Sequence, residues 1–196
     1  MIYTMSMNLG TIWSNKKIQN NRIFKNTSIK RNNVIKVPQV QIRNVSGTAS
    51  KSYWGGAVWM FFHTISVRIN GDYYSNNHQY VWDFIKKICK TLPCPYCQQH
   101  ASAYVDKIAI HQINTKDKLK TVLFNFHNSV NNRIGKKSEN ISILNKYNRA
   151  NIKAIFDLFE ERFFHSYIGT RNFSDWIKNG VKKEYYDFFN NVRTKF

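Results

Sequence analysis

Two of the three cysteines in this 196-residue chain stand three positions apart, in the stretch Cys94-Pro95-Tyr96-Cys97. A C-x-x-C pair can close a small disulfide, and a helix that begins at the motif can acidify an exposed thiolate. In an intracellular protein this spacing indicates thiol redox chemistry or half of a metal site, because three cysteines are too few for a disulfide framework.

The string C-P-Y-C is also that of the glutaredoxin active site, in which a β-strand leads into the motif and a cis-proline faces the disulfide. Here residues 80–92 lead in, and their apolar side chains recur at three- and four-residue steps, which is the pattern of one buried helical face. The only prolines are Pro38, Pro93 and Pro95, so none lies downstream of the motif. We therefore exclude a glutaredoxin fold.

Helical periodicity describes most of the remaining chain, and no segment has the pattern of a paired strand. Helices are predicted over residues 55–67, 77–92, 94–106, 116–134, 150–164 and 175–192. Gly135 is predicted to cap the fourth of them. The sequence thus predicts an all-α protein, with a four-helix bundle over about residues 53–137 and additional C-terminal helices.

Charge is distributed unevenly along the chain. The formal net charge is +19, and no acidic residue precedes Asp72. We interpret residues 1–50 as a basic, disordered leader, with a nucleic-acid arm and a transit peptide as the alternatives. Residues 51–137 form the predicted bundle domain, and residues 138–196 a helical extension that packs back on it or forms a subunit interface. No stretch approaches the ~20 apolar residues of a membrane span, so no transmembrane segment is predicted.

Three segments combine aromatic, imidazole, amide and thiol groups. They read Trp54-Gly55-x3-Trp59-x3-His63, then Leu92-Pro93-Cys94-Pro95-Tyr96-Cys97-x2-His100, then His127-Asn128-x-Val130-Asn131-Asn132-x-Ile134-Gly135-Lys136. A flavin needs a flat apolar slot, polar partners for its adenine and ribose, and cations for its pyrophosphate. The segments offer ring faces from Trp54, Trp59 and His63, polar groups from His127, Asn128 and Asn131, and cations from Arg133, Lys136 and Lys137.

The order and spacing of these segments resemble the Erv/ALR family of FAD-linked sulfhydryl oxidases over about residues 53–137, and most closely the small enzymes of large DNA viruses. The resemblance implies a four-helix bundle around FAD, no metal, and residues 51–137 as the oxidase domain. It implies a cofactor site made by Trp54, Gly55, Trp59, His63, His127, Asn128, Val130, Asn131 and Lys136.

The same resemblance implies a reaction. Cys94 would exchange with the thiols of a dithiol protein substrate, and Cys97, the sulfur nearest the flavin, would pass two electrons to FAD and then to O2, giving hydrogen peroxide. The protein is expected to lower the thiol pKa. Many relatives carry a structural cysteine where this chain has Phe124, and a second, shuttle C-x-x-C in a flexible tail. Neither is found here, so a substrate or a separate thioredoxin-like shuttle protein is expected to deliver electrons directly. A homodimer is expected by the same resemblance, and Cys89 is expected to be a buried core thiol.

Two other kinds of protein would use the same residues differently. Cys89, Cys94, Cys97 and His100 could form a structural zinc site. The positive charge could instead serve a nucleic-acid or partner-binding protein, although no recognition motif supports specific nucleic-acid binding. The expected location is the host cytoplasm or the virion for a viral enzyme, with the mitochondrial intermembrane space as the alternative.

Overall fold

The computed structural model describes residues 50–168 and 170–196, and the elements within this part of the chain are all helical, with no strand. The α-helices are α2 (Lys51–Arg68), α3 (Gly71–Lys90), α4 (Pro95–Val105), α5 (Lys116–Arg133), α6 (Ile152–His165) and α7 (Asp175–Val192). Two 3-10 segments are η1 (Ile110–Gln112) and η2 (Ile141–Arg149). The predicted all-α class is confirmed, whereas almost all of the predicted leader lies outside the described residues.

Helix α3 begins earlier than the sequence pattern predicts. Asn70 is its N-cap, and its side-chain oxygen accepts a hydrogen bond from the backbone N–H of Tyr73 at 2.9 Å. The predicted start at Asn77 coincides with a kink, where φ is −129° and ψ is 17°. The prediction therefore found the second part of a bent helix, because the first part is polar and lacks an apolar stripe.

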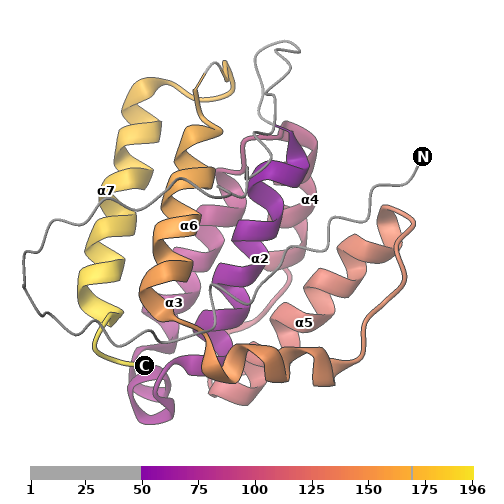
Figure 1. Cartoon of the computed structure of the whole chain (residues 1–196), viewed down its shortest axis with the longest axis vertical. Coiled ribbons are helices and arrows are strands. Elements are labelled where there is room, and N and C mark those ends of the chain that lie inside the picture. The colour runs from indigo at the N-terminus through magenta and orange to yellow at the C-terminus, as the bar shows by residue number, and fades with distance from the viewer. Residues whose placement is uncertain (1–49, 169) are drawn as a thin grey trace, which may run out of the picture.

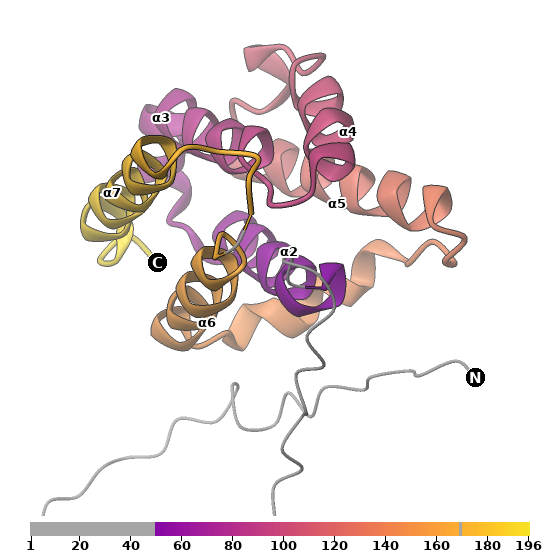
Figure 2. The same cartoon turned by 90° about the horizontal axis from the view of Figure 1, so that it is seen from above.

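Helix α2 is the central element of the fold. Figure 2 shows it between α6 and α5, and it packs against both as well as against η2. Every side chain from residue 60 to residue 66 is buried, so this helix has no solvent-facing side along that stretch. A helix that is buried on all sides has mostly apolar residues around its whole circumference. Three buried residues of this stretch are polar, namely His63, Thr64 and Ser66.

The two C-terminal helices share the core of the four helices before them. Phe61 of α2 stacks on Phe159 of α6 with ring centroids 4.2 Å apart. Phe84 of α3 stacks on Phe188 of α7 with centroids 3.9 Å apart and an interplanar angle of 6°. Figure 1 shows α6 and α7 side by side along one flank of the molecule. Residues 138–196 thus contribute to a single hydrophobic core.

The predicted cap at the end of α5 is also present. Gly135 has a φ of +72°, a left-handed conformation that glycine adopts without a Cβ clash. The backbone N–H of Lys136 then donates to the carbonyl of Asn131 at 2.8 Å. This turn directs the chain back toward η2. The helical periodicity of the sequence does not predict the η2 segment.

Candidate redox and cofactor site

The C-x-x-C motif forms the beginning of α4. Cys94 is the N-cap residue, Pro95 occupies the first helical turn, and Sγ of Cys94 accepts a hydrogen bond from the backbone N–H of Cys97 at 3.3 Å. The two Sγ atoms lie 2.6 Å apart, and both residues are half-buried. The helix start therefore brings the two sulfurs together and leaves them partly accessible to a thiol.

Burial and the neighbouring sulfur dominate the electrostatics of Cys97. Loss of solvent, the hydrogen bond to Cys94 and the charge of Cys94 together raise the pKa of Cys97 to about 12, against the opposing effect of Lys51 and Arg133. The expectation that the protein lowers the thiol pKa is wrong for Cys97. Its side chain lies inside the first turn, whereas an acidified thiolate would need an open position facing the free N–H groups.

A second cluster joins α2 to α5. The ring of Trp59 stacks on His127 with centroids 4.1 Å apart and an interplanar angle of 7°, and His63 stacks against the same indole at 5.9 Å. Nε2 of His63 and Nδ1 of His127 lie 2.9 Å apart and share a hydrogen bond. The structure therefore brings together three of the residues that the sequence predicts for a cofactor.

Both imidazoles of this cluster are neutral at physiological pH. Burial is the largest effect and lowers the pKa of His63 to about 3, with further lowering by His127 and Lys146. Burial also lowers the pKa of His127 to about 4, again with contributions from Lys146 and then Lys136. A neutral imidazole keeps one acceptor nitrogen, so the pair can both donate and accept hydrogen bonds.

A row of rings leads from α4, the helix that begins at the redox motif, to this cluster. Phe126 lies 5.1 Å from Trp59, and Tyr104 stacks on Phe126 at 4.3 Å. His100, one turn after Cys97 on α4, lies 6.3 Å from the same phenyl ring. The row thus runs from α4 across α5 to α2.

The sequence analysis did not assign Tyr104 or Phe126 to the site. Their signals were present, because Tyr104 follows Cys97 by two helical turns and Phe126 precedes His127. Both have the pattern of core residues, and helical periodicity does not distinguish a core ring from a ligand-facing one.

The other predicted cofactor residues have more varied positions. Trp54 is only 5% exposed, so its indole offers little open face, and Asn131 is buried. The side chain of Asn128 donates to the carbonyl of Glu139 and accepts from its backbone N–H, both at 3.0 Å. The structure therefore brings Asn128 to the turn after α5. Gly55 and Val130 are half-buried and Lys136 is exposed.

Two residues of η2 cover the imidazole pair and were not predicted. Tyr147 is buried with its ring 5.4 Å from that of His63. Lys146 is close enough for its charge to affect both imidazoles. Lys136 is also close enough to lower the pKa of His127, so two cations lie near this imidazole, where an anionic group could bind.

The zinc alternative does not assemble in the described part of the chain. Cys89 is buried on the inner face of α3, and no group of three or more His, Cys, Asp or Glu side chains within residues 50–168 and 170–196 is arranged to hold a metal ion. None of the helices in those residues combines the length and apolar character needed to span a bilayer.

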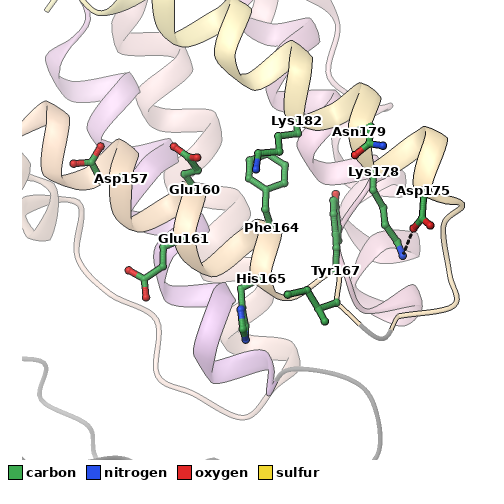
Figure 3. A pocket seen from close by; sticks show the side chains of 11 residues that line it. Asp157, Glu160, Glu161, Phe164, His165, Tyr167, Asp175, Lys178, Asn179 and Lys182 are labelled. Atoms are coloured by element: carbon green, nitrogen blue, oxygen red, sulfur yellow. Dashed lines mark hydrogen bonds and ion pairs between the residues drawn. The ribbon is translucent and has the colours of Figure 1, made fainter.

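Two surface cavities lie away from this site. One of about 830 Å³ lies between α6 and α7 and is lined by acidic, basic and aromatic side chains (Figure 3). The other, of about 500 Å³, is bordered by the end of α2, the start of α5, and η2. Neither is lined by the cysteines or the imidazole pair, so the ring cluster, rather than either cavity, is the candidate site.

Comparisons with known proteins agree with this assignment. The chain is 33% identical over 84 residues to a protein of Invertebrate iridescent virus 3 that is named as a candidate FAD-linked sulfhydryl oxidase, covering 42% of this chain and 57% of the relative. It is 32% identical over 93 residues to a similarly named protein of Invertebrate iridescent virus 6, covering 42% of this chain and 80% of the relative. It is 29% identical over 85 residues to the FAD-linked sulfhydryl oxidase of an African swine fever virus isolate, covering 43% and 71%.

These matches cover only part of this chain and of its relatives. The chain spans less than two thirds of the iridescent virus 3 and Frog virus 3 relatives, at 57% and 63% of their lengths. No solved structure matches the chain significantly. The model of the Erv1/Alr family matches residues 56–157, just over half of the 196 residues, and extends past residue 137 into α6. The matched region holds the cysteine pair, the imidazole pair and the ring row between them, and the chain therefore belongs to the Erv1/Alr family.

Proposed function

We propose that this protein is an FAD-dependent sulfhydryl oxidase that converts protein dithiols to disulfides. The observation that carries the proposal is the row of rings that joins α4, the helix that begins at the cysteine pair, to the imidazole pair. At one end, the half-buried sulfurs of Cys94 and Cys97 lie 2.6 Å apart. At the other end, two neutral imidazoles stack against Trp59. Viral relatives named as FAD-linked sulfhydryl oxidases support the same reaction class.

The residues present fit a flavin nucleotide. Nδ1 of His63 is buried and, among the described residues, has no hydrogen-bond partner, so the cluster has an unsatisfied polar atom. Trp59 and His127 stack directly on each other, so a ligand would lie against an outer face of this stack rather than in a slot between the two rings. Lys136 and Lys146 supply positive charge beside that face. These five groups, counting both histidines, would hold the cofactor.

The exchange half of the proposed reaction gives each sulfur a different role. A substrate thiolate attacks Sγ of Cys94, which breaks the Cys94–Cys97 bond and forms a mixed disulfide with Cys94. Cys97 leaves with the electron pair and, because its pKa is raised to about 12, takes up a proton at neutral pH. A second substrate thiolate then attacks the substrate sulfur of the mixed disulfide, which releases Cys94 as a thiolate and leaves an oxidised substrate.

The backbone N–H of Cys97 supports this assignment of Cys94. It points at Sγ of Cys94 and can stabilise the thiolate released in the second exchange. FAD, when bound, supplies the remaining chemistry by accepting two electrons from the reduced pair and passing them to O2, with hydrogen peroxide as product.

The substrate class and location are part of the same proposal. We expect a dithiol protein or a separate thioredoxin-like shuttle as the electron donor, because the third cysteine, Cys89, is buried and burial raises its pKa further. The viral relatives favour the host cytoplasm or the virion as the place of action, and a homodimer remains a prediction.

The decisive experiment is an absorption spectrum of the purified protein before and after anaerobic addition of dithiothreitol. Flavin bands that bleach with the dithiol and recover in air, with one peroxide formed per dithiol consumed, are the expected result. Protein that retains FAD but whose bands do not respond to dithiols would contradict the electron path. Protein that neither carries nor takes up FAD would contradict the cofactor.

A further inference from the structure

The backbone just before Cys94 is held by side chains from a distant part of the chain. The hydroxyl of Tyr167 donates to the carbonyl of Thr91 at 2.7 Å, across a sequence separation of 76 residues. The amide of Asn172 donates to the carbonyl of Pro93 at 2.8 Å, across 79 residues. Both donors lie in the connection between α6 and α7 (described residues 166–168 and 170–174), beyond the region matched by the family model.

These two bonds complete the turn between α3 and α4. Carbonyls at the end of a helix have no intrahelical partner and need other donors. Within the turn itself, Thr91 donates to the carbonyl of Lys87 at 2.8 Å, and Gln98 donates to that of Lys90 at 2.6 Å. The carbonyls nearest to Cys94 have their donors in the α6–α7 connection.

The connection is itself well anchored. Tyr167 is only 4% exposed, and its ring packs on that of Phe173 with centroids 6.0 Å apart. The ammonium group of Lys178 donates to the carbonyl of Thr170 at 3.2 Å and to the carboxylate of Asp175 at 3.2 Å. Figure 3 shows Tyr167 and Lys178 on the same wall of the cavity between α6 and α7. Figure 2 shows this connection crossing over to the α3–α4 turn.

We infer that the α6–α7 connection positions the redox pair, with Tyr167 and Asn172 as positioning residues that favour the disulfide form of Cys94 and Cys97. A turn fixed at Thr91 and Pro93 keeps the Sγ atom of Cys94 at the N-cap, within reach of Cys97. Releasing the turn increases the freedom of the reduced pair more than that of the pair already joined by a covalent bond. The inference rests on the proposed function only in taking Cys94 and Cys97 as the redox pair.

The test is the thiol–disulfide equilibrium of the full chain in anaerobic glutathione buffers. The protein dithiol reacts with glutathione disulfide to give the protein disulfide and two glutathione thiols, so the disulfide fraction gives an equilibrium constant. That fraction is measured by alkylating the free thiols and determining the mass of the peptide that contains the motif by mass spectrometry. The reading does not depend on bound flavin or on peroxide formation, so a failure of the proposed oxidase activity is seen separately.

Tyr167→Phe and Asn172→Ala should each shift this equilibrium toward the dithiol by about threefold to tenfold, the size expected for one hydrogen bond. For a two-electron couple that shift is about 15 to 30 mV in reduction potential. Asn172→Asp, which keeps the shape but lacks the donor, should shift the equilibrium at least as much as Asn172→Ala.

Matched controls remove similar bonds made by side chains of α7. The buried hydroxyl of Tyr185 donates to the carbonyl of Phe156 at 2.9 Å, and the amide of Asn191 donates to the hydroxyl of Tyr80 at 3.3 Å. Tyr185→Phe and Asn191→Ala should keep the equilibrium within twofold of the parent, even where they lower the free energy of unfolding. If Asn172→Ala leaves the equilibrium within twofold of the parent, or if the controls shift it equally, the positioning role is wrong.

Discussion

Cys94 and Cys97 belong to one motif but have different surroundings. The first is the N-cap residue, whose sulfur accepts a backbone N–H, whereas the second lies inside the first turn with a raised pKa. Cys89 differs from both because it is 1% exposed and packs in the core. The three cysteines therefore differ in burial and in hydrogen bonding even though their side chains are the same.

The residue-scale prediction concerns these three thiols. Cys97→Ser should lower dithiol oxidation by about 100-fold or more, because a hydroxyl cannot form the disulfide, while bound flavin is retained. Cys89→Ser is the control and should retain most of the activity. Peroxide release and the flavin spectrum are measured together. Turnover by Cys97→Ser near the parent rate would contradict the mechanism.

The imidazole pair predicts a dependence of stability on pH. An unfolded histidine has a pKa near 6.5, whereas the folded pKa values are about 3 for His63 and about 4 for His127. Between these values the unfolded chain binds more protons, so the free energy of unfolding falls as pH decreases below 6.5. Each imidazole should lower the free energy of unfolding by about 2 kcal/mol or less when the pH falls from 7 to 5.

Urea unfolding of the parent and of His127→Gln at pH 7 and pH 5 measures this effect. The variant should lose less stability than the parent over that interval, because it retains one buried imidazole. His111→Gln changes an exposed histidine of η1 and serves as the control. Equal losses in the parent and His127→Gln would show that the pair does not carry the pH dependence.

Local pattern predicted much of the site at this scale. The motif order predicted Cys94, Cys97, Trp59, His63 and His127. The structure brings the two sulfurs together and, as a separate cluster, the indole and the two imidazoles. The motif order could not predict that the side chain of Asn128 would form hydrogen bonds with the backbone of Glu139, because Glu139 lies in a turn without periodicity. Tyr167 and Asn172 act over separations of 76 and 79 residues, which no local pattern reports.

At the scale of the elements, the end of α5 contacts the redox motif and also sets the direction of the chain that follows. Its last turn holds Asn131 and Arg133, whose guanidinium lies 3.9 Å from the ring of Tyr96 in the redox motif. The left-handed turn at Gly135 then directs the chain toward η2, which covers the imidazole pair. The predicted helix and its cap were right, but η2 was missed because a 3-10 segment has a different period from an α-helix.

The element-scale prediction compares two glycines. Gly135→Ala should lower the free energy of unfolding by about 1 to 2 kcal/mol, because its φ of +72° is unfavourable for a residue with a Cβ. Gly180→Ala, in α7 with no atom within 4 Å of the added carbon, should raise stability by about 0.5 to 1 kcal/mol. Chemical denaturation of both variants gives the comparison, and effects of the same sign would contradict the assigned cap.

At the scale of the whole molecule, the family region and the C-terminal helices form one core. Phe61 of α2 contacts Phe156 and Phe159 of α6, and Tyr185 of α7 joins the same cluster. The sequence predicted helices in residues 138–196 but left open whether they pack on the bundle or on another subunit. Amphipathic pattern shows that a face is apolar, not what covers it.

Truncation gives the molecule-scale prediction. A chain ending at residue 150 lacks α6 and α7 and exposes Phe61 and Phe84, so it should lose cooperative thermal unfolding and aggregate. Deletion of residues 1–49 retains the core described above and should unfold cooperatively near the parent midpoint. Calorimetry of both chains tests this, and a truncated chain that unfolds cooperatively would show that the helices before residue 150 fold without α6 and α7.

The burial of residues 60–66 of α2 on all sides also affects how the protein is made. A ribosome releases α2 long before α6 and α7, and at 5–20 residues per second the remaining synthesis takes roughly ten seconds. During that time the face of α2 that packs against α6 has no cover. We therefore expect the nascent chain to need chaperone contact at this face, and reduced surroundings for its three thiols, until its last helix emerges.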